Sequence, residues 1–449
     1  MSFPRRQTDQ PLSDEAAALS KAMLRKLMPL LVMVYVVSFL DRTNIALARQ
    51  TMGIDLGISA AAYGLGAGLF FLTYALFEIP SNLIMQRVGA RLWITRIMLT
   101  WGVLSMGMAW VQGETSFYVM RLLLGVAEAG LFPGVMLYLT YWFNREERAR
   151  ATGYFLLGVC VANIVGGPLG GALLELDGVL GWHGWQWLFV CEGLPTILLA
   201  YIVWRVLPDG PASARWLSQQ QAASLMQRLA AGQVSESKNK CGRHALFRVI
   251  QDKQVWLAIF VYFCHQLTIY TTIFFLPSMI GASGHFSPFM IGILSATPWI
   301  TAAIGAATLP RFASTSNRSR GLLMIGLLTM AAGLLLAAHS SPAIGLMGLC
   351  LSATMFFVVQ SVIFTFPSSR LHGAALAGGL ALVNSCGLLG GFVGPAVMGW
   401  IEQSSSNPMH GLVVLASVLV LAAGCSVALR HGDEEQMGRH AARRPTHLA

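Results

Sequence analysis

The chain has 449 residues, of which 55% are hydrophobic and 11% are charged, and its mean hydropathy is +0.61. A soluble globular domain carries about a quarter charged residues, so this composition excludes an ordinary soluble enzyme or binding domain. It predicts instead an all-α integral membrane protein. The net charge of +10 is compatible with a nucleic-acid partner only if the basic residues gather on one surface, and their distribution along the chain shows another pattern.

Twelve apolar segments are long enough to span a bilayer. Because the first 26 residues are polar and basic and the first apolar run is of spanning length, we expect no cleavable signal peptide. A polar insert divides the spans into two sets of six, which predicts two six-helix bundles. The expected parts are an N-terminal tail (1–26), a first bundle (27–207), a linker (208–253), a second bundle (254–430) and a C-terminal tail (431–449). The predicted spans are 27–48, 62–85, 92–111, 116–142, 150–174, 186–207, 255–279, 288–310, 320–338, 343–366, 373–400 and 411–430.

Lys and Arg alternate between the two sides of these spans. Of the 30 basic residues, 27 lie in the tails and in the even-numbered connections, whereas Arg49 is the one basic residue in an odd-numbered connection. The positive-inside rule then predicts that both termini are cytoplasmic. The basic character is explained by this topology, so we expect a lipid bilayer as the partner of the chain and no nucleic acid.

The first span carries Asp41 and Arg42 at its centre, and the fourth span carries Arg121 and Glu128. A charge at bilayer depth costs roughly 2.5–3.5 kcal/mol on insertion scales, so these residues indicate a polar cavity or a bound ion. A guanidinium group matches the geometry of a carboxylate, and we therefore expect Arg42 and Arg121 to bind an organic anion. The alternative is a static ion pair, either Asp41 with Arg121 or Glu128 with Arg42.

Asp41 and Glu128 are the candidates for proton coupling. Burial favours the neutral form of a carboxylic acid, while a nearby arginine favours the charged form. The proton affinity of each acid would then depend on whether a substrate occupies the arginine.

Other polar residues within the spans are weaker candidates. Tyr74, Gln360, Ser361 and Asn384 are expected to contribute hydroxyl and amide groups to the substrate site. Three residues near the predicted cytoplasmic side are interpreted as gate or structural contacts: Glu78, Arg87 and Arg91. Glu192 is interpreted as structural, and His265 as a core residue that is the next proton carrier to test.

The sequence shows no pattern of an enzyme, a cofactor site or a metal site. It contains no Walker A sequence and no HExxH, and its Gly-rich stretches lie inside apolar spans. The seven cysteines are scattered without a CxxC pair, which is typical of small packing residues. We therefore expect no catalytic residue, no cofactor and no metal.

The fifth and eleventh spans resemble each other. The fifth contains GGPLGGALL and the eleventh contains GLLGGFVGPAVMG, at the same place in each set of six. Ordinary close packing of helices explains part of this pattern. The matched positions also favour two related bundles with a substrate site between them near the bilayer midplane.

Several of these segments resemble the anion:cation symporter subgroup of the major facilitator superfamily. They are FLDRTNIALA in the first span, EIPSNLIMQRVGARLWITR after the second, GVAEAGLFPGVMLYLTYWF in the fourth, GWQWLFVCEGLPTILLA in the sixth, and GGLALVNSCGLLGGFVGP in the eleventh. The similarity covers nearly the whole chain. Asn82 and Gln86 stand where the superfamily's loop motif has Gly and Asp, and Phe39 stands where many members have Tyr.

The resemblance implies an importer of a sugar acid, a dicarboxylate or an aromatic acid by proton symport in the cell inner membrane. It also implies that the family's functional residues fall on Asp41, Arg42, Tyr74, Arg121, Glu128 and Asn384. We expect a monomer. A proton-coupled exporter and a membrane sensor without transport remain as alternatives. The sequence leaves the roles of His265 and Arg370 open.

Overall fold

The computed structural model describes residues 14–237, 249–282, 284–313, 315–371, 374–405 and 409–431. Within these ranges the regular elements are all helices. Some residues covered by the sequence analysis lie outside the described residues, namely Arg5, Arg6, Cys241 and most of the C-terminal tail. The helices of the first half are α1 (Asp14–Leu56), α2 (Ala60–Val88), α3 (Ala90–Gly107), α4 (Glu114–Glu128), α5 (Leu131–Thr140), α6 (Arg145–Leu174) and α7 (Gly184–Val206). Those of the second half are α10 (Lys253–Ala282), α11 (Pro288–Thr308), α12 (Ser316–His339), α13 (Pro342–Thr354), α14 (Phe356–Ile363), α15 (Thr365–Arg370), α16 (Ala374–Leu388), α17 (Gly390–Ser405) and α18 (Met409–Ser426).

Twelve segments of the described chain are long and apolar enough to cross a membrane, and each overlaps one predicted span. The prediction of an all-α membrane protein with twelve spans is therefore confirmed. The predicted cytoplasmic location of both termini stays a prediction. Between the halves, the insert contains α8 (Gln219–Ser237), which packs on the first half through the buried Leu225 and an Arg228–Glu147 ion pair.

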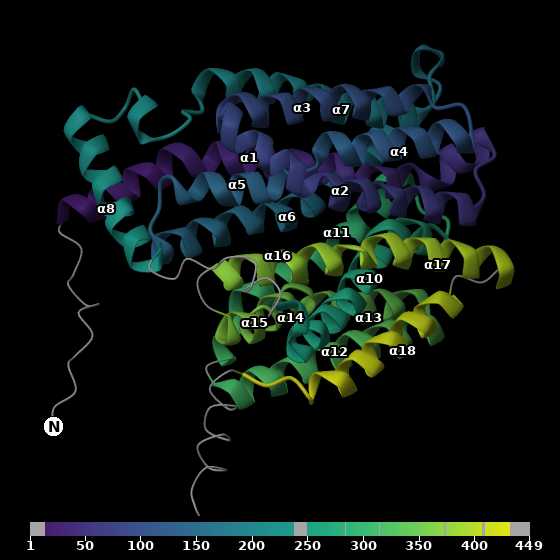
Figure 1. The fold of residues 1–449 in the computed structure, drawn as a ribbon. Coiled ribbons are helices and arrows are strands. Elements are labelled where there is room, and N and C mark those ends of the chain that lie inside the picture. Colours follow the sequence, from purple (N-terminus) through teal and green to yellow (C-terminus); the bar gives the residue numbers. More distant parts are fainter. Residues whose placement is uncertain are drawn as a thin grey trace, which may run out of the picture.

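Figure 1 shows the two halves as separate layers, with α1 to α7 above and most of α10 to α18 below. We call the end of the layers where α8 lies the inner end, following the predicted orientation, and the opposite end the outer end. The chain reaches the outer end at the loops around residues 57–59, 108–113, 175–183, 284–287 and 340–341.

Three predicted spans are not continuous helices. The fourth span is broken between α4 and α5 at Ala129 and Gly130, and Gly130 has a φ of 88° that favours glycine. A Cβ atom there would also lie 2.3 Å from the Ser81 hydroxyl of α2. The tenth span consists of α13, α14 and α15, and the eleventh of α16 and α17. The break in the fourth span directly follows Glu128, so it places that carboxylate at a helix end.

Glycines bring the two halves together at the outer end. A Cβ atom on Gly167 of α6 would lie 2.3 Å from the Gly292 carbonyl oxygen of α11, and one on Gly64 of α2 would lie 2.2 Å from the Pro395 carbonyl oxygen of α17. Backbones approach this closely only when the side chains between them are absent. Gly167 and Pro395 belong to the Gly-rich fifth and eleventh spans, so these two spans contribute to the contact between the bundles.

Hydrogen bonds between the halves gather at the same end. The Arg49 guanidinium of α1 donates to Glu402 of α17 at 2.7 Å, and it lies over the rings of Tyr63 and Phe275. The Tyr63 hydroxyl donates to the Phe274 carbonyl oxygen of α10 at 3.1 Å. The structure is therefore a state in which the outer end is closed.

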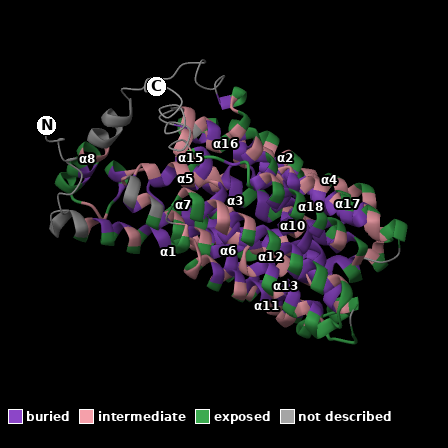
Figure 2. Cartoon of the chain, turned by 90° about the horizontal axis from the view of Figure 1, so that it is seen from below, coloured by how far each residue is buried: buried purple, intermediate pink, exposed green. Residues whose placement is uncertain are grey.

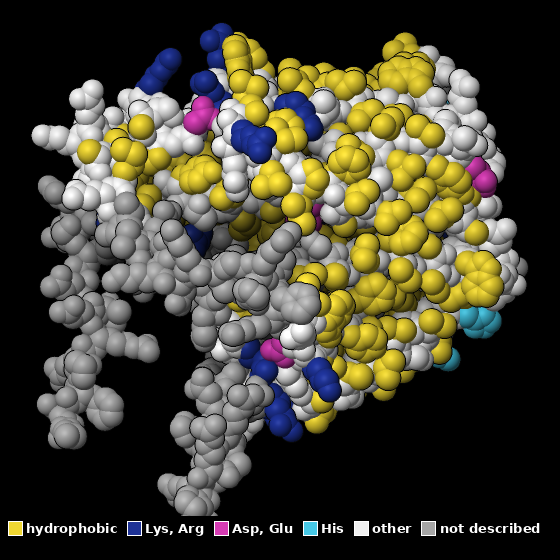
Figure 3. All heavy atoms as spheres, in the orientation of Figure 1, with side chains coloured by type: hydrophobic (Ala, Val, Ile, Leu, Met, Phe, Trp, Pro, Cys, Tyr) yellow, Lys and Arg dark blue, Asp and Glu magenta, His cyan; other side chains and the backbone are white. Residues whose placement is uncertain are grey.

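The outer surface of the helices is apolar. Figure 2 shows many buried residues in the middle of the bundle and exposed ones along its periphery. Large hydrophobic side chains face outward on many helices, among them Leu76, Val103, Leu198, Ile304 and Met347, all more than half exposed. In Figure 3 such side chains cover much of the right-hand part of the visible face, while Lys and Arg gather toward the inner end. This surface fits lipid.

Candidate functional site

The centre of the first half holds a buried ion pair between Arg42 and Glu128. An Arg42 Nη2 atom of α1 donates to Glu128 Oε1 at the end of α4, and both side chains are more than nine-tenths buried. Ser38, one turn earlier on α1, donates its hydroxyl to the same oxygen at 2.6 Å. Of the two static ion pairs considered from the sequence, this one is present. An unpaired charge at this depth would be costly, so the pair stabilises both helices against each other.

Aromatic rings surround the Arg42 guanidinium. Its central carbon lies 4.8 Å from the Phe39 ring, 5.1 Å from the Phe70 ring and 5.3 Å from the Tyr74 ring. The Tyr270 hydroxyl of α10 interacts with it from the second half. The rings hold the cation through their π faces, so the guanidinium lies in a buried aromatic cage at the interface of the two halves.

Arg121 is bonded to the backbone of a neighbouring helix and to no acid among the described residues. Its Nε and Nη2 atoms donate to the carbonyl oxygens of Gly66 and Ala67 on α2, at 3.2 and 3.1 Å. Its central carbon lies 5.0 Å from the ring of Phe70, which it shares with Arg42. The two arginines therefore both contact one ring, although they lie on different helices.

Asp41 points to a separate set of partners. Trp101 Nε1 and the Ser105 hydroxyl, one turn apart on α3, donate to it at 2.7 and 2.8 Å, and the Thr196 hydroxyl of α7 donates at 2.8 Å. None of these partners is a cation. The expected alternative of an Asp41–Arg121 ion pair is absent, because α1 turns Asp41 toward α3 and α7 and away from α4.

This arrangement can exchange one anion for another. Arg42 holds a carboxylate of the protein at a position where α1, α2, α4 and α10 meet. A carboxylate from outside the protein can occupy the same guanidinium if Glu128 gives it up. Asp41 accepts hydrogen bonds from three neutral donors, none of which belongs to the Arg42–Glu128 pair. It can therefore gain or lose a proton without breaking that pair.

The other predicted site residues are less closely connected. Tyr74 contacts Arg42, as stated above. Gln360 of α14 donates to the Tyr262 hydroxyl at 3.2 Å, while the exposed Ser361 donates to the Val358 carbonyl oxygen of its own helix. Asn384 is half-buried on α16, and no contact joins it to either arginine.

The predicted gate and structural residues lie toward the inner end. Glu78 of α2 is buried and accepts a hydrogen bond from Ser385 of α16 at 3.4 Å, which links the two halves. Arg91 lies beside Asp209, whose Oδ1 accepts from the Arg91 backbone N–H at 2.9 Å. Arg87 is exposed at the end of α2.

Two residues whose roles the sequence left open have structural partners. His265 is fully buried, and its Nε2 lies 2.9 Å from the Phe356 carbonyl oxygen, as in a packed core position. Arg370 donates to Asp252 at 3.1 Å near the start of α10. Among the described residues, no group of His, Cys, Asp and Glu is arranged to hold a metal ion.

Sequence reasoning missed the partners of the charged residues. Ser38, Trp101, Ser105 and Thr196 all lie inside apolar spans, where polar groups need partners. Trp101 and Ser105 are four residues apart and so share a helix face, which is a signal that the sequence did contain. Nothing in the sequence indicated which charged residue that face would meet.

Comparisons with known proteins agree with this architecture. The profile of the Major Facilitator Superfamily matches residues 31–395 and, in a second match, 258–448. The chain belongs to the major facilitator superfamily. It is therefore a multi-pass membrane transporter and not an enzyme.

Several curated relatives of this transporter are similar over nearly their whole length. A quinolone resistance transporter of Acinetobacter baumannii is 42% identical, over 88% of this chain and 91% of the relative. A putative tartrate transporter of Agrobacterium vitis is 38% identical, over 95% and 97%. The inner membrane transport protein RhmT of Escherichia coli is also 38% identical, over 90% and 95%. These relatives agree with the resemblance to the anion:cation symporter subgroup.

Solved structures share the fold. The inward open conformation of the xylose transporter XylE from E. coli has a TM-score of 0.72 at 14% identity, covering 92% of this chain and 99% of that one. A bacterial homologue of the human lysosomal transporter Spinster, inward-facing and unoccupied, has a TM-score of 0.70 at 20% identity, with coverage of 91% and 96%.

Proposed function

We propose that this transporter moves a small organic carboxylate, such as a sugar acid, a dicarboxylate or an aromatic acid, into the cell together with protons. The observation that carries the proposal is the buried Arg42–Glu128 pair at the interface of the two halves. It is a site already built for a carboxylate, and at present it is occupied by one from the protein. Arg121, which lies over the same Phe70 ring as Arg42, supplies a second guanidinium for the anion.

Proton coupling follows from competition for Arg42. When the substrate takes the guanidinium, Glu128 loses its counter-charge in a dry environment, and its neutral form becomes favoured. One anion and one proton then enter the site together, so the charge of the site is unchanged. When the substrate leaves, Glu128 returns to Arg42 and its proton is released. Asp41 is the second proton-carrying acid.

Alternating access of the two halves moves this site from one side of the membrane to the other. Arg42 lies on α1 of the first half, while Tyr270 approaches from α10 of the second half. Separation of the halves at the outer end, where Arg49 and Glu402 now join them, would expose Arg42 to the outside. In this cycle Glu78 and Ser385 form a contact of the inner gate.

A second candidate function is proton-driven export of amphipathic compounds. The observation that favours it is the 42% identity to a transporter named for quinolone resistance. The same buried arginines are suited to an aromatic acid in either direction. The buried arginines favour an anionic compound over a cationic one as the transported species.

The test combines binding and transport. Purified transporter is screened against a panel of organic acids by thermal shift, and the best ligand is followed in proteoliposomes with and without an inside-alkaline pH gradient. We expect accumulation that requires the gradient and is abolished by a protonophore. Uptake that ignores the pH gradient would refute proton symport, and accumulation driven only in the opposite direction would support the exporter.

A further inference from the structure

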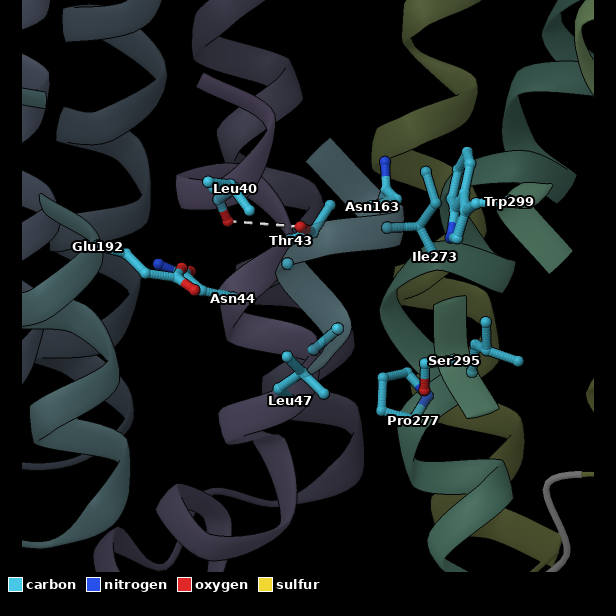
Figure 4. Close-up of a pocket in the computed structure, with 14 residues that line it drawn as sticks. Leu40, Thr43, Asn44, Leu47, Asn163, Glu192, Ile273, Pro277, Ser295 and Trp299 are labelled. Carbon is cyan, nitrogen blue, oxygen red and sulfur yellow. Dashed lines mark hydrogen bonds between the residues drawn. The ribbon is translucent and has the colours of Figure 1, made fainter. Parts of the chain in front are cut away.

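A small cavity lies between the two halves, on the outer side of Asp41. Its volume is about 30 Å³, enough for one or two water molecules. The polar residues that line it come from four helices: Thr43 and Asn44 of α1, Asn163 of α6, Glu192 of α7 and Ser295 of α11. Figure 4 shows Glu192 and Asn44 on one side of this space and Trp299 on the other.

Glu192 is a buried acid without a full set of partners. The residue is 4% exposed, and its Oε2 atom has no hydrogen-bond partner among the described residues. The Asn44 side chain, itself 2% exposed, lies against the carboxylate and is its hydrogen-bonding neighbour. Buried polar atoms in native proteins are satisfied by protein or by ordered water in the large majority of cases, so the unpartnered Glu192 oxygen beside a cavity indicates bound water.

No described cation neutralises Glu192. On α1 the one charged group that acts on it is Asp41, which is also an acid. On α6 it meets Gly170, where an added Cβ would lie 3.6 Å from Glu192 Oε1, and the amide of Asn163 lines the same cavity. The neighbouring face of α3 presents Gly102 and Met106, and α10 and α11 contribute only neutral side chains to the cavity. Arg42 is engaged by Glu128.

Glu192 lies on α7 between the outer end of the helix and Thr196, the residue that contacts Asp41. It lies eight residues from the start of α7 at the outer end, or about 12 Å along the axis. Thr196 lies one turn deeper and donates to Asp41 Oδ2. The order from the outer end is therefore cavity, Glu192, Thr196 and Asp41.

We propose that Glu192 is a further proton-carrying residue, which takes up protons from water in the cavity and passes them to Asp41. This inference rests on the proposed proton symport. In the uptake step a hydronium ion in the cavity becomes water as Glu192 Oε2 binds its proton. In the transfer step protonated Glu192 and ionised Asp41 become ionised Glu192 and protonated Asp41, so this step leaves the number of protons on the pair unchanged. Asp41 and Glu192 are buried acids, Asp41 acts electrostatically on Glu192, and no described cation neutralises Glu192, so ionising both is costly and the pair favours a shared proton.

Labelling tests the protonation of Glu192 without any substrate. A hydrophobic carbodiimide reacts with protonated buried carboxyl groups, and mass spectrometry locates the product. We expect labelling of the peptide that contains Glu192 in the full-length transporter, with less labelling as the pH rises and none in Glu192→Gln. Absence of labelling at every pH where the protein stays folded would overturn the inference.

Transport by matched variants tests the relay. Glu192→Gln should lower uptake driven by a pH gradient by roughly tenfold or more, as expected when a proton-transfer group is lost. Exchange of internal for external substrate, which needs no net proton movement, should stay within about twofold of wild type. Glu192→Asp keeps a carboxylic acid and should restore much of the gradient-driven uptake.

The transport results of the Glu192 variants distinguish the proton relay from proton symport itself. Equal losses of uptake and exchange in Glu192→Gln, with no rescue by Glu192→Asp, would show a structural role and overturn the relay. Normal gradient-driven uptake in Glu192→Gln would overturn it while leaving proton symport by this transporter intact. A wild-type protein that ignores the pH gradient would overturn both, and uptake driven by sodium through Glu192 would replace the proton with a metal cation.

Discussion

Asp41 and Arg42 are neighbours in the chain, yet they bond to different helices. Asp41 accepts hydrogen bonds from α3 and α7, while Arg42 donates to Glu128 at the end of α4. Consecutive residues on a helix point about 100° apart, so one helix presents the acid and the base to separate environments. The adjacent charges are thus not each other's partners. In the proposed transport cycle, protonation of Asp41 and binding of an anion at Arg42 would therefore be separate events that α1 connects.

The first prediction concerns the two arginines. Arg42→Lys and Arg121→Lys keep the positive charge and lose the planar fork, so each should weaken binding of the organic acid. Loss of one charge-assisted hydrogen bond is worth about 1.5–3 kcal/mol, or roughly ten- to a hundredfold in Kd. Isothermal titration with the acid found by the screen measures the change.

Arg215→Lys is the control for the arginine variants, because Arg215 is exposed in the linker before α8. Its affinity should equal that of wild type. If Arg42→Lys and Arg121→Lys both bind the acid as tightly as the control, these arginines do not hold the substrate.

The second prediction concerns the contact of α6 with α11. Gly167→Leu should hold the halves apart at the outer end, since even a Cβ atom there overlaps the Gly292 carbonyl oxygen. We expect strongly reduced uptake with normal membrane insertion. Gly391→Leu should act similarly, because a Cβ atom at Gly391 would lie 2.9 Å from the Tyr270 ring of α10 and 3.0 Å from the Phe71 ring of α2.

Gly153→Leu is a control on α6 itself, because no atom lies within 4 Å of its Cβ position. It should transport normally. Normal uptake by Gly167→Leu would instead mean that α6 and α11 can separate without loss of function.

Hydrophobicity and charge predicted most of the fold. Twelve spans were expected, and the described part of the chain contains twelve helical segments long and apolar enough to span. A helix satisfies its own backbone groups within lipid, so apolar runs of this length form helices there. The break after Glu128 was not predicted. It depends on Ser81 of α2, which donates its hydroxyl to the Ala129 carbonyl oxygen at 2.7 Å and so satisfies the group that the break exposes. A contact between distant segments of this kind leaves no trace in hydropathy.

The sequence predicted which residues form the candidate site, but it did not predict which of them contact each other. Intramembrane charge identified Asp41, Arg42, Arg121 and Glu128, because such residues are costly at depth. Which acid meets which arginine depends on the rotation of each helix about its axis. Neighbouring helices fix that rotation, so the sequence left Glu128–Arg42 and Asp41–Arg121 equally open. Glu192 was interpreted as structural, since its unpartnered oxygen is visible only in three dimensions.

The third prediction concerns closure of the outer end. The double variant Arg49→Gln, Glu402→Gln removes the ion pair that joins α1 to α17 and should favour the outward-open state. A loss of about 1.4 kcal/mol would change the ratio of the two states about tenfold. Spin labels at Gln112→Cys and Ser341→Cys, both exposed at the outer end, should report longer distances between the halves.

The spin-label experiment needs a parent protein in which the seven native cysteines are replaced. The matched control is Arg205→Gln, which changes an exposed arginine that contacts Tyr201 and Trp204 within α7. Its distance distribution should match that of the parent. An unchanged distribution in the double variant would show that the glycine contacts alone close the outer end.

The last prediction concerns energy coupling by Asp41 and Glu128. Asn and Gln mimic the protonated acids, so the double variant Asp41→Asn, Glu128→Gln should leave Arg42 free for the substrate at any pH. It should bind the acid at least as tightly as wild type, because no carboxylate of the protein competes for the guanidinium. It should also exchange substrate across the membrane, yet fail to accumulate it, since no proton needs to enter or leave with the anion. Proteoliposome uptake with and without an inside-alkaline gradient separates these two activities.

The single variants separate the two acids. Glu128→Gln alone should remove most of the competition at Arg42. Asp41→Asn alone should leave the Arg42–Glu128 pair intact and affect coupling without tightening binding. If the double variant still concentrates the acid in response to the gradient, another group carries the proton, and His265→Asn is then the variant to measure.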